Sequence, residues 1–255
     1  MKTSQQLVIS NLEEKLKLFT HAVSGELIKE ANYVIANTEI PTDTFNMLLA
    51  KSPTVRNENH MKQAINHFLV KKFPFSTWVD ANNLSNDWLQ LIKEHNLKEA
   101  ERNIMMKLDH TLHTGQRISN HLNITQVSNK EGLLQYKEVF LSLFEGTPER
   151  NALEIYFHKF SQEKLASNAR MFIGCIMEMP VATGLLIEDN DSYGIYDVMT
   201  KETFRGKGYG SEMFQFLLNQ TIDKQKPVVL QASEDGKNIY KRFGFKEVGE
   251  MIVFE

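Results

Sequence analysis

The chain lacks the features that mark several classes of protein. It has a single cysteine, Cys175, in 255 residues, so no disulfide can form within it, as expected in the reducing cytoplasm. Its net charge is only −3, and no run of lysines and arginines indicates a nucleic-acid partner. No apolar run is long enough to span a bilayer, and the first residues lack the apolar core of a signal peptide. We therefore expect a cytoplasmic protein that binds neither nucleic acid nor membranes.

Glycine and proline are also few, at 13 and 6 residues, which excludes collagen-like and disordered chains. The apolar residues instead mix helical and strand-like spacings, which predicts an α/β protein. The chain should begin with a helix that has Leu12, Leu16 and Phe19 on one face, followed by a short helical segment around Leu27 and Ile28. The other elements expected in the first half are strands at 32–39, 45–50, 75–79 and 98–108 and helices at 58–72 and 84–95.

A polar connector at 109–121 leads into a second half that repeats this order of elements. FNMLLAK (45–51) and IYDVMTK (195–201) each precede a helix, and Trp88 and Tyr240 occupy matching places on a later short helix. These offsets are all about 150 residues, which predicts a duplication. The elements expected in the second half are strands at 122–127, 170–177, 181–188, 193–200, 228–232 and 248–254 and helices at 130–144, 149–162, around 213–218 and at 235–243.

The most informative motif is RGKGYG (205–210), between an expected strand and an expected helix. Alternate glycines leave the backbone bare where the free N–H groups of the first helical turn point outward, which is a cradle for phosphate. A P-loop would need GxxxxGK[ST], which is absent, and a dinucleotide fingerprint would need glycine where Ser211 stands. The motif therefore indicates a diphosphate ligand of another kind.

Arg205, Gly208 and Gly210 match the Arg/Gln-x-x-Gly-x-Gly/Ala signature of the GCN5-related N-acetyltransferases (GNAT), and the chain resembles that superfamily. A second motif, ASEDGKNIYKRFGF (232–245), resembles the family's segment along the pantetheine of acetyl-CoA. The resemblance implies an acyl-CoA N-acyltransferase fold, with a mixed, mostly antiparallel sheet flanked by helices. The implied domains are a degenerate GNAT-like N-terminal domain, 1–115, and a catalytic N-acetyltransferase domain, 120–255.

The first half differs at the place of the glycine motif. There it has SPTVRNENH (52–60), which contains no glycine and would crowd a diphosphate. Only the second half is therefore expected to bind acetyl-CoA (coenzyme A).

The resemblance also implies roles for individual residues. Tyr240 takes the place of the family's general acid, and the Val198 N–H is the expected oxyanion donor. Ser233 stands where many members have asparagine, so a weaker polar contact to the cofactor is expected there. The residues expected to bind acetyl-CoA are Val198, Met199, Thr200, Arg205, Gly206, Lys207, Gly208, Tyr209, Gly210, Ser211, Ser233 and Tyr240.

The general base and the acceptor are less defined. Asp197 on the strand beside the acetyl site, or Glu178 at an earlier turn, could take the proton of the amine, or the amine could arrive deprotonated. The expected reaction is direct transfer, in a ternary complex, to a primary amine of a small molecule or peptide. Four acids within 129–165, Glu145, Glu149, Glu154 and Glu163, would suit a cationic amine. The first half is expected to complete the acceptor cleft or to pair two subunits in a homodimer. The alternative function is a non-catalytic acyl-CoA-binding module that regulates or scaffolds a partner.

Other candidate residues have simpler interpretations. His110, His113 and His121 match no zinc spacing, so no metal is predicted. Trp78 and Trp88 are expected in the core of the first half.

Overall fold

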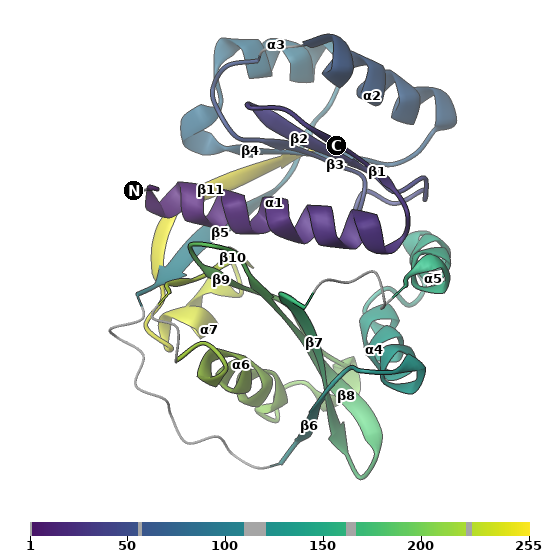
Figure 1. The fold of residues 1–255 in the computed structure, drawn as a ribbon, viewed down its shortest axis with the longest axis vertical. Helices are drawn as coiled ribbons and strands as arrows, with labels where there is room; N and C mark the ends of the chain where they lie inside the picture. The colour runs from purple at the N-terminus through teal and green to yellow at the C-terminus, as the bar shows by residue number, and fades with distance from the viewer. Residues whose placement is uncertain (1, 56–57, 110–120, 162–166, 223–225) are drawn as a thin grey trace.

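The computed structural model describes residues 2–55, 58–109, 121–161, 167–222 and 226–255 (Figure 1). The elements of its first half are α1 (Ser4–Ala22), β1 (Glu26–Lys29), β2 (Tyr33–Asn37), β3 (Met47–Ala50), α2 (Glu58–Lys71), β4 (Ser76–Asp80), α3 (Asn86–Glu94) and β5 (Glu99–Leu108). Those of its second half are β6 (Asn123–Gln126), α4 (Lys130–Ser142), α5 (Glu149–Lys159), β7 (Ala169–Ile176), β8 (Met179–Glu188), β9 (Tyr193–Thr200), α6 (Tyr209–Asn219), β10 (Val228–Ser233), α7 (Lys237–Lys241) and β11 (Lys246–Phe254). Short 3₁₀ turns occur at Ala81–Asn83 and Glu202–Phe204.

Helix α1 begins at a capping box, in which Thr3 and Gln6 bond each other's backbone N–H groups. The predicted helical segment around Leu27 and Ile28 is wrong, because these residues lie in strand β1 and pair with β2. The helix ends at Ala22, and two residues later Ser24 has a left-handed φ of 59°. At Gly25 a Cβ atom would lie 2.6 Å from the carbonyl oxygen of Asn37, so glycine allows the chain to turn back against β2.

The described strands form one sheet in the order β1-β2-β3-β4-β11-β5-β10-β9-β8-β7-β6. Only the pairs β3–β4 and β9–β10 are parallel among those described, which confirms the predicted mixed, mostly antiparallel sheet. From β1 to β5 and from β7 to β11 the two halves have the same order of strands and α-helices, with a parallel pair of strands joined by a helix, α2 in the first half and α6 in the second.

The last strands of the two halves are exchanged. Strand β5 pairs with β10 of the second half, and β11 pairs with β4 of the first half, while β5 and β11 pair with each other. The sheet therefore runs without interruption across the boundary between the predicted domains, 1–115 and 120–255. The division of the chain into these two domains stays a prediction.

The helices cover the sheet in separate groups (Figure 1). Helices α2 and α3 pack on the first half, and α6 packs on the second. Helix α1 lies between the two halves, where its buried face shares a core cluster with apolar residues of α4 and α5 (Figure 1). Among the residues described, no helix combines the length and apolarity needed to cross a bilayer.

Candidate active site

Strands β9 and β10 pair only at their first residues. The parallel register joins Val228 to Tyr193 and Val229 to Gly194, and no later pair between these strands occurs in the described chain. Beyond that point β10 stays paired with β5, and β9 stays paired with β8. The two strands therefore diverge, and the sheet opens between them.

A β-bulge in β9 lies at this opening. One residue of β8, Gly184, faces two residues of β9, Asp197 and Val198. Asp197 has a φ of 49°, a left-handed conformation that non-glycine residues rarely adopt. The Thr183 hydroxyl donates to the Asp197 carbonyl oxygen at 2.8 Å and fixes the bulge from the β8 side. A bulge changes the direction of the backbone groups that follow it, here those of Val198.

The glycine motif forms an open loop at the start of α6. Gly206 and Gly208 have φ of 75° and 89°, and a Cβ atom on either would meet no atom within 4 Å. The first helical bond runs from the Glu212 N–H to the Gly208 carbonyl at 2.9 Å. The N–H groups of residues 209–211 therefore have no acceptor within the helix, and they lie at its positive end.

The loop is attached to the end of β9. The Arg205 Nε donates to the Thr200 carbonyl at 3.2 Å, and a Cβ on Gly210 would lie 3.1 Å from the Thr200 Oγ1. The Lys207 ammonium lies 5.1 Å from the centre of the Phe204 ring. The exposed charges of Arg205 and Lys207 thus stand beside the helix N-terminus.

Tyr240 on α7 packs against the apolar side of α6. Its ring centre lies 4.9 Å from that of Phe214 and 6.3 Å from that of Phe245. Burial raises the pKa of the Tyr240 phenol. Ser233 ends β10, and its hydroxyl accepts the Gly236 N–H at 3.1 Å, so it forms the turn before α7.

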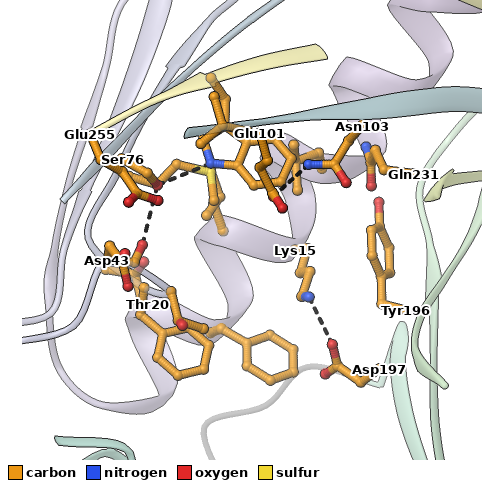
Figure 2. Close-up of a pocket in the computed structure, with 18 of the residues that line it drawn as sticks. Lys15, Thr20, Asp43, Ser76, Glu101, Asn103, Tyr196, Asp197, Gln231 and Glu255 are labelled. Carbon is orange, nitrogen blue, oxygen red and sulfur yellow. Dashed lines mark hydrogen bonds and ion pairs between the residues drawn. The ribbon is translucent and has the colours of Figure 1, made fainter. Parts of the chain in front are cut away.

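A cavity of about 560 Å³ extends from the opening between β9 and β10 into the first half (Figure 2). Asp197, Val198 and Tyr240 line it together, and their roles in catalysis stay predictions. Met199, Thr200, Ser233 and the glycine loop are not part of its lining. The remaining wall comes from α1, β3 and the loop before it, β4, β5, β10, β11, the α4–α5 loop and the start of α5. The first half thus closes a pocket that begins at the second half's bulge.

Residues 167–247, which contain β7 to β10, the glycine loop and Tyr240, match the family model described as an acetyltransferase (GNAT) domain. This part of the chain belongs to the GNAT superfamily. No curated protein sequence is significantly similar to the chain.

Solved structures extend the GNAT likeness over both halves. A GCN5-related N-acetyltransferase from Kribbella flavida has a TM-score of 0.67 at 12% identity, covering 97% of this chain and 94% of that one. A functionally unknown protein from Staphylococcus epidermidis has the same TM-score at 17% identity, covering 91% and 94%. A tandem GNAT protein from the clavulanic acid biosynthesis pathway has a TM-score of 0.57 at 9% identity, covering 97% and 94%. At these identities the likeness concerns the fold, and it includes the two-half arrangement.

Within the GNAT domain, the Asp197 carboxylate has two close partners from other elements. The Lys15 ammonium of α1 lies 3.0 Å from its Oδ1, and the Tyr136 hydroxyl of α4 donates to its Oδ2 at 3.1 Å. Burial, followed by the nearby charge of Asp197, raises the pKa of Tyr136 well above its ordinary value. The role of Asp197 as general base stays a prediction.

The opposite end of the cavity is acidic (Figure 2). The hydroxyls of Thr42 and Thr44 donate to the Glu149 carboxylate. Burial and the neighbouring Glu149 raise the pKa of Asp43, and burial and Asp43 raise the pKa of Glu255. Among the described lining residues, five are acidic and only Lys15 is basic.

Other predicted candidates lie elsewhere. Glu178 is exposed at the turn between β7 and β8 and does not line the cavity. Glu145 and Glu154 pair with Arg150 at the surface. The N–H of His121 donates to the Glu212 carboxylate at 2.9 Å. Three further candidates, His110, His113 and Glu163, lie outside the described residues.

Sequence reasoning missed several lining residues. Trp88 is fully buried, as predicted, but Trp78 lines the cavity and donates its Nε1–H to the Ser76 hydroxyl at 3.0 Å. Lys15 and Asp43 are also lining residues that no motif marks. Both residues are far from Asp197 along the chain, so no local sequence pattern indicates that they line the same cavity.

Proposed function

We propose that the chain is an acetyl-CoA-dependent N-acetyltransferase that moves an acetyl group to a primary amine of a small molecule or peptide in a ternary complex. The observation that carries the proposal is the opening between β9 and β10. It lies between a phosphate-cradle loop and a cavity lined by Val198 and Tyr240. A thioester carrier could therefore reach the opening from the side of the loop, and an amine could reach it from the cavity.

The loop fits the diphosphate of the carrier. The bare backbone at Gly206 and Gly208 faces open space, and the N–H groups of residues 209–211 supply donors at the positive helix end. Arg205 and Lys207 add positive charge beside them. Acetyl-CoA supplies the activated acetyl thioester when it is bound there.

The roles of the chain's own residues follow from the chemistry of acyl transfer. The amine nitrogen forms a bond to the acetyl carbon as the carbon–sulfur bond breaks. The Val198 N–H donates to the acetyl oxygen, which gains negative charge as the bond forms. Tyr240 gives its phenol proton to the departing thiolate and recovers one from solvent. The proton lost by the amine goes to Asp197 or to water.

The charge of the cavity favours a cationic acceptor. Asp43, Glu149 and Glu255 lie together at the end remote from Tyr240, and carboxylates so close repel one another, a repulsion that a retained proton or a bound cation relieves. A primary amine with a second positive group could place that group among these acids while its reacting nitrogen lies near Val198. We therefore propose a di- or polyamine-like acceptor.

Cofactor binding is tested by calorimetry with acetyl-CoA. Gly208→Val should weaken binding at least tenfold, because a side chain would stand where the diphosphate must approach. Gly146→Val is the matched control, since Gly146 also has a positive φ and open space around a built Cβ, but lies in the α4–α5 loop. Equal affinity of wild type and Gly208→Val would contradict the proposed cofactor site.

Turnover is tested by release of the CoA thiol. The probes are 1,5-diaminopentane, 5-aminopentan-1-ol and 5-aminopentanoate, which share a chain and an amine and differ in the charge of the second group. We expect the diamine to react fastest, Glu149→Gln to reduce this preference, and Glu154→Gln, on the same helix, to retain it. Tyr240→Phe should slow release. Binding of acetyl-CoA without release for any amine would instead support the non-catalytic acyl-CoA-binding module.

A further inference from the structure

Two residues outside strand β9 contact the Asp197 side chain at its bulge. Lys15 comes from α1 at the beginning of the chain, and Tyr136 comes from α4. Their ammonium and hydroxyl groups lie 3.0 Å and 3.1 Å from different oxygens of the Asp197 carboxylate. The Asp197 side chain is only 11% exposed, so this contact is sheltered from water and weakly screened.

The backbone of Asp197 needs such support. Its φ of 49° costs on the order of 1 kcal/mol or more for a residue other than glycine. The carbonyl is held by the Thr183 hydroxyl, while the side chain is held by Lys15 and Tyr136. Fixing both ends of Asp197 fixes the plane of the peptide bond that follows it, and the N–H of that peptide belongs to Val198.

Lys15 is itself firmly placed. Its ammonium lies 4.7 Å from the centre of the Tyr196 ring, and the Tyr196 hydroxyl donates to the Asn11 side chain at 2.9 Å. Asn11 is fully buried one helical turn before Lys15. Helix α1 thus meets β9 through two successive polar contacts, which set the distance between the helix and the bulge.

We infer that Lys15 and Tyr136 are positioning residues for acetyl transfer, which act through Asp197 to aim the Val198 N–H into the opening between β9 and β10. This inference rests on the proposed function. It makes the first helix of the chain a determinant of the second half's transfer rate. It also gives Asp197 a structural task that is separate from proton transfer.

The test compares Lys15→Met with Lys17→Met, which removes a lysine from the exposed side of the same helix. With acetyl-CoA and 1,5-diaminopentane, Lys15→Met should lower kcat by roughly 10- to 100-fold, a loss comparable to or below that of one oxyanion donor. The calorimetric Kd for acetyl-CoA should stay within twofold, because the loop is untouched. Lys15→Arg should recover much of the rate, and Tyr136→Phe should give a smaller loss.

A second readout does not depend on turnover. In protein labelled with ¹⁵N-valine, with the signal assigned through Val198→Ile, the Val198 amide should shift when acetyl-CoA binds to wild type or Lys17→Met. The shift should be lost or altered in Lys15→Met at saturating acetyl-CoA. Asp197→Asn is the alternative variant if Lys15→Met does not fold, since it removes the charge and keeps the shape.

The outcomes separate the two proposals. Failure of wild type to bind acetyl-CoA overturns the proposed function and this inference with it. Binding without release of CoA overturns only the catalytic part of the function, and the Val198 signal still tests the positioning. An unchanged Val198 shift and an unchanged kcat in Lys15→Met overturn the inference alone.

Discussion

Gly194→Ala should destabilise the protein strongly, because Gly194 is one of the places where α1 packs closely against strand β9. A Cβ atom there would lie 1.9 Å from the Asn11 Oδ1 and 2.4 Å from the Tyr196 Cε2, where ordinary contacts begin at 3.4 Å. The Asn11 amide cannot simply move aside. It is fully buried, it accepts the Tyr196 hydroxyl at 2.9 Å, and its Nδ2 donates to the Ser192 hydroxyl at 3.2 Å.

Two costs combine in this variant. Overpacking a rigid site costs about 1–3 kcal/mol. Displacing Asn11 leaves a buried hydroxyl without its acceptor, which costs about 1–3 kcal/mol more. The expected loss in free energy of unfolding is therefore roughly 2–6 kcal/mol. At ~2–4 °C per kcal/mol for a chain of this size, the melting temperature should fall by about 4–24 °C.

Urea unfolding measures the loss in free energy of unfolding, provided that the m-value is the same in variant and wild type. Gly146→Ala is the control, because its positive φ costs about 1–2 kcal/mol but no atom lies within 4 Å of its built Cβ. The double variant Asn11→Ala/Gly194→Ala should lose less free energy of unfolding than the two single variants together. The Asn11→Ala change removes the side chain that the new Cβ atom at position 194 would strike. The reasoning is refuted if Gly194→Ala is no less stable than Gly146→Ala.

Two pH-dependent predictions follow from carboxylates of the first half. The Lys71 ammonium, with His67 and Asn37, holds the pKa of Glu39 at about 2, below its ordinary 4.5. The stabilisation by Glu39 is therefore present above pH 4.5 and lost as pH falls towards 2. Glu39→Gln should lower the free energy of unfolding by at most ~1 kcal/mol at pH 7, because the carboxylate is two-fifths exposed. The loss measured by urea unfolding should be smaller at pH 3. Asp43 has the opposite sign: its pKa is raised, so its ionised form disfavours the fold above that pKa. Asp43→Asn should raise the melting temperature of the ligand-free protein at pH 7, and the gain should shrink as acid protonates the wild-type carboxyl; a gain that grows on acidification would contradict this.

Local signals explain what the sequence could predict. The glycine loop and Tyr240 lie within one stretch of chain, and their spacing reflects contacts between neighbouring elements. Most strands and helices followed from apolar periodicity and from caps such as Ser85, whose hydroxyl accepts the Trp88 N–H. Strand β1 was missed because four residues show too little periodicity to distinguish a strand from a helix, and pairing with β2 decided its conformation.

The features that the sequence could not predict depend on contacts between residues that are distant along the chain. Lys15 precedes Asp197 by 182 residues, and no spacing rule relates them. The exchange of β5 and β11 was also unpredictable, since both are long strands that begin with an exposed stretch and end with a buried one, and no local signal assigns either to its neighbours. The cavity's acidic end combines Asp43 with Glu149, which approach each other only because the first half packs over the second.

The exchange of β5 and β11 has a consequence for synthesis of the protein. Strand β11 must enter between β4 and β5, yet ~140 residues are translated after β5 before β11 emerges, which takes about 7–30 s at 5–20 residues per second. During that interval the facing edges of β4 and β5 have no native partner. Unpaired edges of this kind recruit strands from other chains. A nascent first half in which β4 paired directly with β5 would have to open that pair again before β11 could take its place between them.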